Sequence, residues 1–513
     1  MSTSADTAAP PFQAIADLAR QHALARPNQR ALVQGERSVT WAQLNAMMDR
    51  VAASLQRDGL KPGQAIAICA ANSLEYVAVF LGALRAGVAV APLSTHSLPA
   101  QLATMAADSG AKHFFVDGAV PAFSTGAKRI FMDRAATPSL EEWLAPAGSK
   151  PKPVKTQPQW PFNIIYSSGT TGTPKGIVQS HGMRWAHVAR AESYGYGPDA
   201  VTLIATSLCS NTTLVCFFPT MAKGGCVVLA PPKFDAAGYL ALAEKERATH
   251  TMLVPVQYQR IMALPEFDDY NLSAFEMKFC TSAPFHAQLK ADILARWPGG
   301  LVEFYGMTEG GGTCILEAHL YPDKLATVGT PPEGHVFHVL DEEGKQLPPG
   351  EIGEVVGHSP ASMMTAYHNQ PQKTREAEWH DGEGRRYIRT GDVGRFDAQG
   401  FLTLMDRRKD MVISGGFNIY PSDIEAILRQ HPAVADAAVI GVPSTEWGES
   451  PVACVVRTAG AGASEDEIQA WTNQQVGKTQ RLAAVRFMAE LPRSEIGKVL
   501  KRQLRDSWVN NRA

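Results

Sequence analysis

Residues 167–176 read Ser-Ser-Gly-Thr-Thr-Gly-Thr-Pro-Lys-Gly, and this stretch constrains the fold more than any other. It follows an apolar run at 162–166 that predicts a strand, and it precedes a helix predicted to begin near His181. Its glycines let the backbone turn tightly and bring N–H groups close to an anion, while its hydroxyls and Lys175 add further donors. A Gly-rich string alone is often a plain surface loop, and the GxxxxGK[ST] spacing is absent. The flanking strand nevertheless favours a phosphate-binding loop.

Short apolar runs alternate with helical periods on both sides of this loop. Residues 41–57 have helical spacing, with a capping box predicted from Thr40 and Gln43. A helix is also expected at 76–84, and strands at 65–70, 88–91, 163–166, 201–206, 226–229, 252–254 and 277–280. This alternation predicts an α/β protein with mostly parallel sheets.

Changes in composition divide the chain into domains. Residues 144–161 are rich in Pro, Lys and Gly and predict an exposed connection, whereas turn pairs between short β-type runs at 326–405 predict a small antiparallel barrel or sheet. We therefore expect a large N-terminal domain at 1–405, built of two α/β sheet subdomains (about 1–160 and 161–325) and a small β-barrel (326–405). A small, mobile α+β C-terminal domain at 406–513 is expected to follow, joined by a hinge.

Composition excludes several classes of protein. The 513 residues include 48 Lys plus Arg against 50 Asp plus Glu, so the chain lacks the basic character of a nucleic-acid binder. Seven cysteines without a CxxC pair argue against a disulfide framework and favour reduced thiols in the cytoplasm. The most apolar window, 76–93, contains Arg85 and ends near Pro92, so its apolar stretch is too short for a membrane span. The N-terminus does not have the pattern of a signal peptide.

Further motifs follow the Gly-rich loop in a fixed order. They are YGMTE at 305–309, RTGD at 389–392, DRRKD at 406–410, SGGFNIYP at 414–421 and PRSEIGK at 492–498, with LGALRAG at 81–87 before the loop. With these motifs, nearly the whole chain resembles the adenylate-forming superfamily of acyl- and aryl-CoA synthetases, luciferases and peptide-synthetase adenylation domains. The resemblance implies attack of a carboxylate on the α-phosphate of ATP, followed by transfer of the acyl group to coenzyme A.

The resemblance also implies roles for individual residues in the first step. Glu309 would bind Mg²⁺, Thr308 would contact the α-phosphate, and Tyr305 would stack on adenine. Asp392, an acceptor-only carboxylate, would bind the ribose hydroxyls together with Arg407. Nucleotide contacts are expected from Ser167, Ser168, Gly169, Thr170, Thr171, Gly172, Thr173 and Lys175.

The remaining implied roles belong to the C-terminal domain. Lys498 would neutralise charge shared by the carboxylate and the α-phosphate. Lys409 would be the hinge, because the second step requires the small domain to rotate. Ser414, Gly415 and Gly416 would then line the path of coenzyme A, although they also fit an ordinary tight turn.

The sequence departs from the superfamily in the expected acyl pocket. Many members have an aromatic-His pair after the strand near 201–206, whereas this chain has Ser210 at the His position, followed by Asn211. Ser282, before Ala283, stands where Gly is usual. Gly306 and Gly310 complete the expected pocket, and the run Gly310–Gly312 either opens space there or makes the loop flexible.

These patterns lead us to expect an AMP-forming acyl/aryl-CoA synthetase that uses ATP, Mg²⁺ and coenzyme A. Its small-molecule acid would be a medium- or long-chain fatty acid or a bulky aryl or alicyclic carboxylate. A stand-alone adenylating enzyme that loads a carrier protein and a catalytically silent nucleotide-binding protein are the alternatives. No nucleic acid and no integral membrane partner is expected, and a homodimer is left open.

Overall fold

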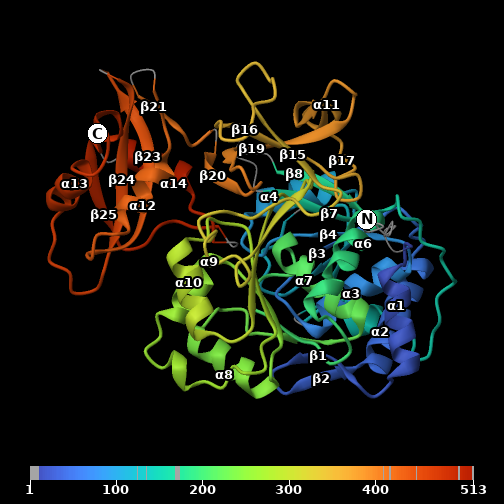
Figure 1. The fold of residues 1–513 in the computed structure, drawn as a ribbon. Coiled ribbons are helices and arrows are strands. Elements are labelled where there is room, and N and C mark those ends of the chain that lie inside the picture. The colour runs from blue at the N-terminus through green and yellow to red at the C-terminus, as the bar shows by residue number, and fades with distance from the viewer. Residues whose placement is uncertain are drawn as a thin grey trace, which may run out of the picture. The chain divides into compact units, whose positions relative to one another are not determined.

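The computed structural model describes residues 11–510 except 124, 134–135, 168–173, 408, 415–416, 446 and 495–496. The chain forms two compact units. The first comprises Met1–Leu325, Pro332–Val336 and Gly357–Ile388, and the second comprises Ala326–Pro331, Phe337–Val356 and Arg389–Ala513. The predicted mixed α/β fold, with a large sheet-built N-terminal part and a separate C-terminal domain, is confirmed (Figure 1). The exact boundary at residue 405 stays a prediction.

The first unit contains a seven-stranded sheet that carries the ends of the Gly-rich loop. Its order is β17 (Ala366–Tyr367), β8 (Lys175–Ser180), β7 (Pro161–Ser167), β4 (Ala89–Pro92), β3 (Ala65–Cys69), β5 (His113–Val116) and β6 (Lys128–Phe131). Neighbours from β7 to β6 are parallel, while β7–β8 and β8–β17 are antiparallel. The antiparallel edge therefore brings a strand from 366–367 next to the loop.

The first unit also contains an eight-stranded sheet. Its order is β14 (Thr313–Glu317), β13 (Gly300–Gly306), β12 (Met277–Cys280), β11 (His250–Leu253), β9 (Val201–Ile204), β10 (Cys226–Leu229), β1 (Arg30–Gln34) and β2 (Arg37–Thr40). The sheets exchange strands across the expected subdomain boundary at 160: β1 and β2 join this sheet, and β7 and β8 join the other. In Figure 1 the blue β1–β2 hairpin accordingly lies apart from β3 and β4. Leu32 and Val33 of β1, both buried, pair in parallel with Val227 and Val228, which explains the exchange.

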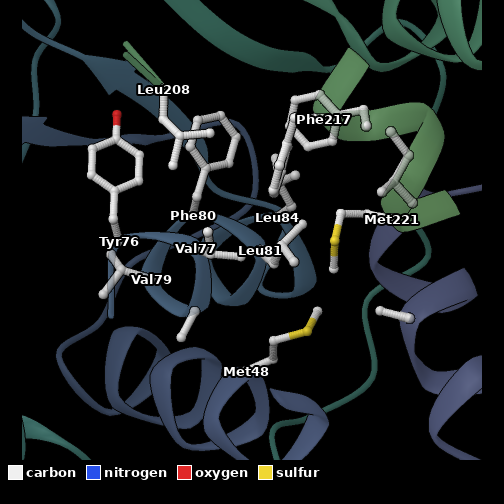
Figure 2. Packing of buried hydrophobic residues seen from close by; sticks show 14 of the residues in the cluster. Met48, Tyr76, Val77, Val79, Phe80, Leu81, Leu84, Leu208, Phe217 and Met221 are labelled. Atoms are coloured by element: carbon white, nitrogen blue, oxygen red, sulfur yellow. The ribbon is translucent and has the colours of Figure 1, made fainter. Parts of the chain in front are cut away.

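Two helices, α3 (Leu74–Arg85) and α7 (Asn211–Lys223), belong to one apolar cluster with strands of both sheets. Every residue of α3 except Glu75 is buried, as expected for a helix covered on all sides. Figure 2 shows Phe80 and Leu84 near Phe217 and Met221 of α7. This packing fixes the N-terminus of α7, where the sequence places part of the acyl pocket.

The capped helix predicted at 41–57 is confirmed as α2 (Trp41–Arg57). Thr40 and Gln43 form the expected capping box, and Gly82 of α3 allows close approach because a Cβ there would lie 2.5 Å from Val51 Cβ. The remaining helices of the first unit are α1 (Ile15–Ala25), α4 (Pro99–Asp108), α5 (Leu140–Trp143), α6 (His181–Arg190), α8 (Ala236–Glu246), α9 (Pro255–Met262), α10 (Ala287–Arg296) and α11 (Pro371–Glu376), with 3₁₀ turns at Ala191–Tyr194 and Phe267–Asp269.

Two five-stranded sheets follow. The third sheet contains β15 (Val336–Leu340), β16 (Gly353–His358), β19 (Arg386–Phe396), β18 (Glu378–His380) and β20 (Leu402–Arg407). The fourth sheet contains β22 (Phe417–Ile419), β21 (Val412–Ser414), β24 (Gly448–Arg457), β23 (Val434–Ser444) and β25 (Ala484–Met488), with α12 (Pro421–Leu428), α13 (Glu465–Asn473), a 3₁₀ turn at Lys478–Gln480 and α14 (Lys501–Asn510). Among the residues described, no helix is both long and apolar enough to cross a membrane.

Candidate active site

The ends of the Gly-rich loop lie on neighbouring antiparallel strands. Ser167, the last residue of β7, pairs with Lys175, the first residue of β8. The predicted helix begins at His181 as α6, but β8 intervenes between loop and helix, which the sequence analysis missed. The predicted nucleotide contacts Ser168, Gly169, Thr170, Thr171, Gly172 and Thr173 lie outside the described residues.

Glu309 is held by a residue that the sequence analysis did not identify, Tyr367. The Tyr367 hydroxyl donates a hydrogen bond of 2.8 Å to Glu309 Oε1, and the Met364 N–H donates to the Glu309 carbonyl oxygen at 2.7 Å. Burial, and then the charge of Glu309, raise the pKa of Tyr367, so its hydroxyl remains a proton donor at neutral pH. Lys175 Nζ lies 4.9 Å from the centre of the Tyr367 ring, within the range of a cation–π contact. The strand pair β8–β17 therefore brings a cation, a phenol and a carboxylate together.

Thr308 is positioned through its backbone by a buried polar network. Gln179 Nε2 donates to the Thr308 carbonyl oxygen at 2.8 Å. Arg184 of α6 donates to Gln179 Oε1 and, at 3.0 Å, to Asn211 Oδ1. Gln179 and Arg184 are fully buried, so this network links β8, α6 and α7 to the loop that contains Thr308 and Glu309. No local pattern in the sequence marks this network, because its members come together only in the fold.

Glu309 has the chemistry expected of a ligand for Mg²⁺. Its Oε2 atom receives no hydrogen bond from a described residue, and carboxylate oxygen is a preferred Mg²⁺ ligand. The described residues contain no cluster of three or more His, Cys, Asp or Glu side chains suited to a metal ion. Magnesium commonly binds through one or two carboxylates plus substrate phosphates, and Glu309 fits that arrangement.

The run Gly310–Gly312 serves a close backbone contact. Gly310 has φ +76°, and a Cβ there would lie 1.9 Å from the Ser362 carbonyl oxygen. Gly311 has φ +85° and donates its N–H to the same oxygen at 3.0 Å. The sequence suggested that these glycines either open a pocket or make the loop flexible, and neither interpretation anticipated this contact. The glycines let the Thr308–Glu309 loop bind the segment that leads to Tyr367.

The expected acyl-pocket residues lie at the ends of α7, β12 and β13. Ser210 caps α7, and its hydroxyl accepts the Thr212 N–H at 3.2 Å. The Thr212 and Ser282 hydroxyls are hydrogen-bonded, which joins α7 to the turn after β12. Ser282, followed by the half-buried Ala283, has φ +84°, a backbone region where glycine is normally favoured. The structure thus brings Ser210, Asn211 and Ser282 to one region.

Tyr305 and Gly306 lie at the end of β13, next to the same loop. Tyr305 is only 9% exposed and pairs with Cys314 of β14, so little of its surface is accessible for stacking on adenine. Gly306 is exposed and pairs with Thr313. A Cβ at Gly306 would lie 3.3 Å from the Gly312 carbonyl oxygen, which is a tight contact.

Asp392 and Arg407 come together in the second unit. They face each other across the antiparallel pair β19–β20, with Arg407 Nε 2.8 Å from Asp392 Oδ1. The Thr390 hydroxyl accepts the Asp392 N–H at 3.0 Å and donates to the Val355 carbonyl oxygen at 2.7 Å. The carboxylate is therefore fixed in place beside a guanidinium group, as an acceptor for hydroxyl groups requires.

Lys498 is exposed on a tight turn of the second unit. The Lys498 N–H donates to Ser494 Oγ at 3.2 Å, and its carbonyl oxygen accepts the Ser494 N–H at 2.8 Å. Arg493 pairs with Asp436 and donates to the Gly497 carbonyl oxygen at 2.6 Å, which fixes the turn to β23.

The predicted hinge and coenzyme A path follow β20. Lys409 is exposed in a turn, and its neighbour Asp410 accepts a hydrogen bond of 3.0 Å from Arg505 of α14. Ser414 is buried and pairs with Phe417 and Gly448, whereas Gly415 and Gly416 lie outside the described residues.

Comparison with known proteins identifies the family. The model for "AMP-binding enzyme" matches residues 19–368, and that for "AMP-binding enzyme C-terminal domain" matches residues 423–498. A feruloyl-CoA synthase of Amycolatopsis is 32% identical over 93% of this chain and 96% of its own length. The long-chain-fatty-acid–CoA ligase FadD13 of Mycobacterium tuberculosis is 32% identical over 95% and 97%. ATP-bound MatB of Rhodopseudomonas palustris has a TM-score of 0.87 at 29% identity, covering 97% of this chain and all of that one.

The chain therefore belongs to the AMP-binding enzyme family. Within that family it groups with the acyl- and aryl-CoA ligases, and it is an AMP-forming acid–thiol ligase. The family uses ATP and coenzyme A as substrates.

Proposed function

We propose that this enzyme activates a carboxylic acid as an acyl-adenylate and transfers the acyl group to coenzyme A. The proposed acid is a medium- or long-chain fatty acid or a bulky aryl or alicyclic carboxylate. The observation that carries the proposal is the grouping of Lys175, Tyr367 and Glu309 beside the Thr308 loop. A cation at one end of the Gly-rich loop, with a positioned carboxylate nearby, suits the binding of a nucleoside triphosphate.

In the first step, an oxygen of the acid attacks the α-phosphorus of ATP, and the bond to the bridging oxygen breaks to release pyrophosphate. Both reactants are anions, so the site must offset negative charge and align the groups. We assign this role to Lys175, the Thr308 hydroxyl and Lys498. Bound Mg²⁺, with Glu309 as ligand, would offset further phosphate charge, while Asp392 and Arg407 would bind the ribose.

In the second step, the thiol sulfur of coenzyme A loses its proton to solvent and attacks the carbonyl carbon of the acyl-adenylate. The bond from this carbon to the phosphate oxygen breaks, and AMP leaves with the bonding electron pair. Lys498 is needed only while the α-phosphate is under attack. We assign the hinge to Lys409 and the coenzyme A path to Ser414, Gly415 and Gly416. Rotation about a few residues can exchange one catalytic arrangement for the other.

A direct test measures pyrophosphate release and thioester formation across a panel of straight-chain, aryl and alicyclic acids, with and without coenzyme A. We expect both products for a subset of acids, with AMP formed in equal amount, and loss of activity when Mg²⁺ is chelated. The Glu309→Gln variant should need a higher Mg²⁺ concentration than the wild type.

The same experiment separates the alternatives. Pyrophosphate release without a thioester for any acid would favour an enzyme that loads a carrier protein. Absence of pyrophosphate release for every acid would overturn the proposal and favour a silent nucleotide-binding protein.

A further inference from the structure

Helix α6 carries three basic side chains at successive three-residue intervals. Arg184 neighbours His187 on the helix surface, and His187 neighbours Arg190, whereas the two arginines are about 120° apart around the axis. A fourth basic side chain, His335, lies near them. Burial, followed by the charges of Arg184, Arg190 and His335, holds the pKa of His187 well below its usual range. The four side chains therefore form one basic cluster, defined here as Arg184, His187, Arg190 and His335.

The two arginines of the basic cluster have no anionic partner among the described residues. Arg184 is fully buried, and its guanidinium donates to neutral acceptors: the amide oxygens of Gln179 and Asn211 and, at 3.3 Å, His187 Nδ1. The atoms Arg184 Nε and Arg190 Nη1 are buried without a hydrogen-bond partner. Within the described part of the chain, neither arginine forms an ion pair with a carboxylate.

A buried cation without a counter-ion destabilises the folded state. Burial lowers the pKa of Arg184 to about 9, so this guanidinium still carries its charge at pH 7. The carboxylate of Glu317 affects the ionisation of Tyr194, next to Arg190, but it does not pair with the arginine among the described residues. Arg184 Cζ lies 5.6 Å from the centre of the Phe162 ring and 5.4 Å from that of Phe218, but no described carboxylate pairs with either arginine, which leaves room for an anionic ligand.

The basic cluster touches two walls of the proposed acyl pocket. Arg184 bonds to Asn211 at the start of α7, at 3.0 Å. On the other side, His335 Nδ1 accepts the Thr313 N–H at 2.9 Å, and Thr313 is paired with Gly306 on β13. The cluster therefore lies between α7 and the β13–β14 pair, the elements that carry the pocket residues.

We propose that the basic cluster binds a second carboxylate of the acid substrate, remote from the carboxyl group that is adenylated. This inference rests on the proposed function and narrows it: the substrate is an aryl or alicyclic dicarboxylic acid. A carboxylate can accept charge-assisted hydrogen bonds from an arginine of the basic cluster, and such bonds are roughly twice as strong as neutral ones. A site with buried polar groups of this kind strongly rejects analogues that leave those groups unpaired.

The first test uses the wild-type enzyme and matched pairs of acids. Each aryl or alicyclic dicarboxylic acid, over a range of spacings, is compared with its mono-acid in which the second carboxylate is a methyl ester or a primary amide. We expect at least one diacid to exceed its matched mono-acids by about 100-fold or more in kcat/KM for thioester formation.

The outcomes distinguish the two proposals. If mono-acids are converted as well as every diacid, the basic cluster does not bind a carboxylate, while the CoA ligase function stands. If no acid gives pyrophosphate or thioester, both proposals are overturned.

The second test changes the cluster. Arg190→Met and Arg184→Lys should each reduce the ratio of kcat/KM for the diacid to that for its mono-acid by about 10-fold or more. If the fully buried Arg184 position does not tolerate substitution, Arg190→Met still tests the proposal. Arg260→Met, on the exposed part of α9, is the matched control and should keep the wild-type ratio. An unchanged ratio in both cluster variants, with circular dichroism showing folded protein, would overturn the assignment.

Discussion

Ser282 shows how one side chain can offset an unfavourable backbone. Its φ of +84° destabilises the folded state by about 1 kcal/mol for a residue with a Cβ, and its hydroxyl hydrogen bond to Thr212 stabilises the folded state by a similar amount. Ser282→Ala keeps the backbone cost and loses the bond, whereas Ser282→Gly loses both. We therefore expect the alanine variant to have a free energy of unfolding about 1 kcal/mol lower than the glycine variant, measured by urea denaturation. Equal stabilities would show that the backbone at this position is not under strain.

Lys498 can be tested without disturbing the fold, because its side chain is exposed on the Ser494–Lys498 turn. We expect Lys498→Ala to reduce adenylation by at least about 100-fold, since the variant lacks the cation that we propose offsets charge in the first transition state. Thioester formation from synthetic acyl-adenylate and coenzyme A should remain near the wild-type rate. Single-turnover kinetics measure each step, and an equal loss in both would contradict the assigned role.

The loop that carries Glu309 offers a test at the scale of elements. Gly310 and Gly334 have nearly the same φ, +76° and +77°, but only Gly310 has a backbone oxygen where a Cβ would lie. Gly334→Ala should lower the free energy of unfolding by about 1 kcal/mol, the usual effect of a Cβ on a left-handed backbone. Gly310→Ala should cost more than about 3 kcal/mol, because the loop must separate from the segment containing Ser362.

This pair of variants also predicts an effect on activity. Separation of the two segments would move Tyr367 away from Glu309, so the Gly310→Ala variant should lose pyrophosphate release while Gly334→Ala retains it. Stability is measured by denaturation and activity by pyrophosphate release. Similar losses in both variants would mean that the close contact at Gly310 is unimportant.

Individual helices and strands were predictable from the sequence, whereas the pairing of strands distant in the sequence was not. The capping box and apolar spacing of α2 are properties of adjacent residues, so its bounds follow directly from the pattern. The strand β8 is short and lies between a loop motif and a helix signal, and no local pattern marks it. The exchange of β1 and β2 into the second sheet depends on β10, nearly 200 residues away, and periodicity contains no information about such pairings.

The same distinction applies to the candidate site. Motifs nominated Lys175, Thr308 and Glu309, which the structure places on neighbouring elements. Tyr367 and Arg184 escaped notice because their importance comes from contacts with residues far away in the sequence. A single Tyr or Arg in the sequence does not indicate a functional role, because the residues that it contacts are known only from the fold.

At the scale of the whole molecule, the proposed hinge at Lys409 lies between two anchored residues. Lys501 of α14 lies 3.0 Å from Glu425 and 3.7 Å from Asp406, and Arg505 of the same helix bonds to Asp410. Proline at 409 would fix φ near −65° and restrict the preceding residue, so rotation should become harder. We expect Lys409→Pro to form acyl-adenylate at close to the normal rate and to transfer the acyl group to coenzyme A at least about 10-fold more slowly.

A matched control separates rigidity from loss of the side chain. Lys409→Ala removes the ammonium group but leaves the backbone free, so transfer to coenzyme A should remain faster than in the proline variant. Single-turnover rates for adenylation and transfer provide the comparison. If the two variants behave alike, the side chain of Lys409 matters and its backbone is not the pivot.

The exchange of strands between the two large sheets affects how the protein is made. On the ribosome, β1 emerges about 200 residues before its neighbour β10, an interval of about 10 to 40 seconds at ordinary rates of synthesis. During that interval β1 can pair with β2, but its parallel neighbour β10 and the rest of the sheet have not yet been made. The nascent chain must therefore be kept from associating with others until residue 229 has left the exit tunnel, and a fragment ending near residue 160 should bind chaperones instead of folding.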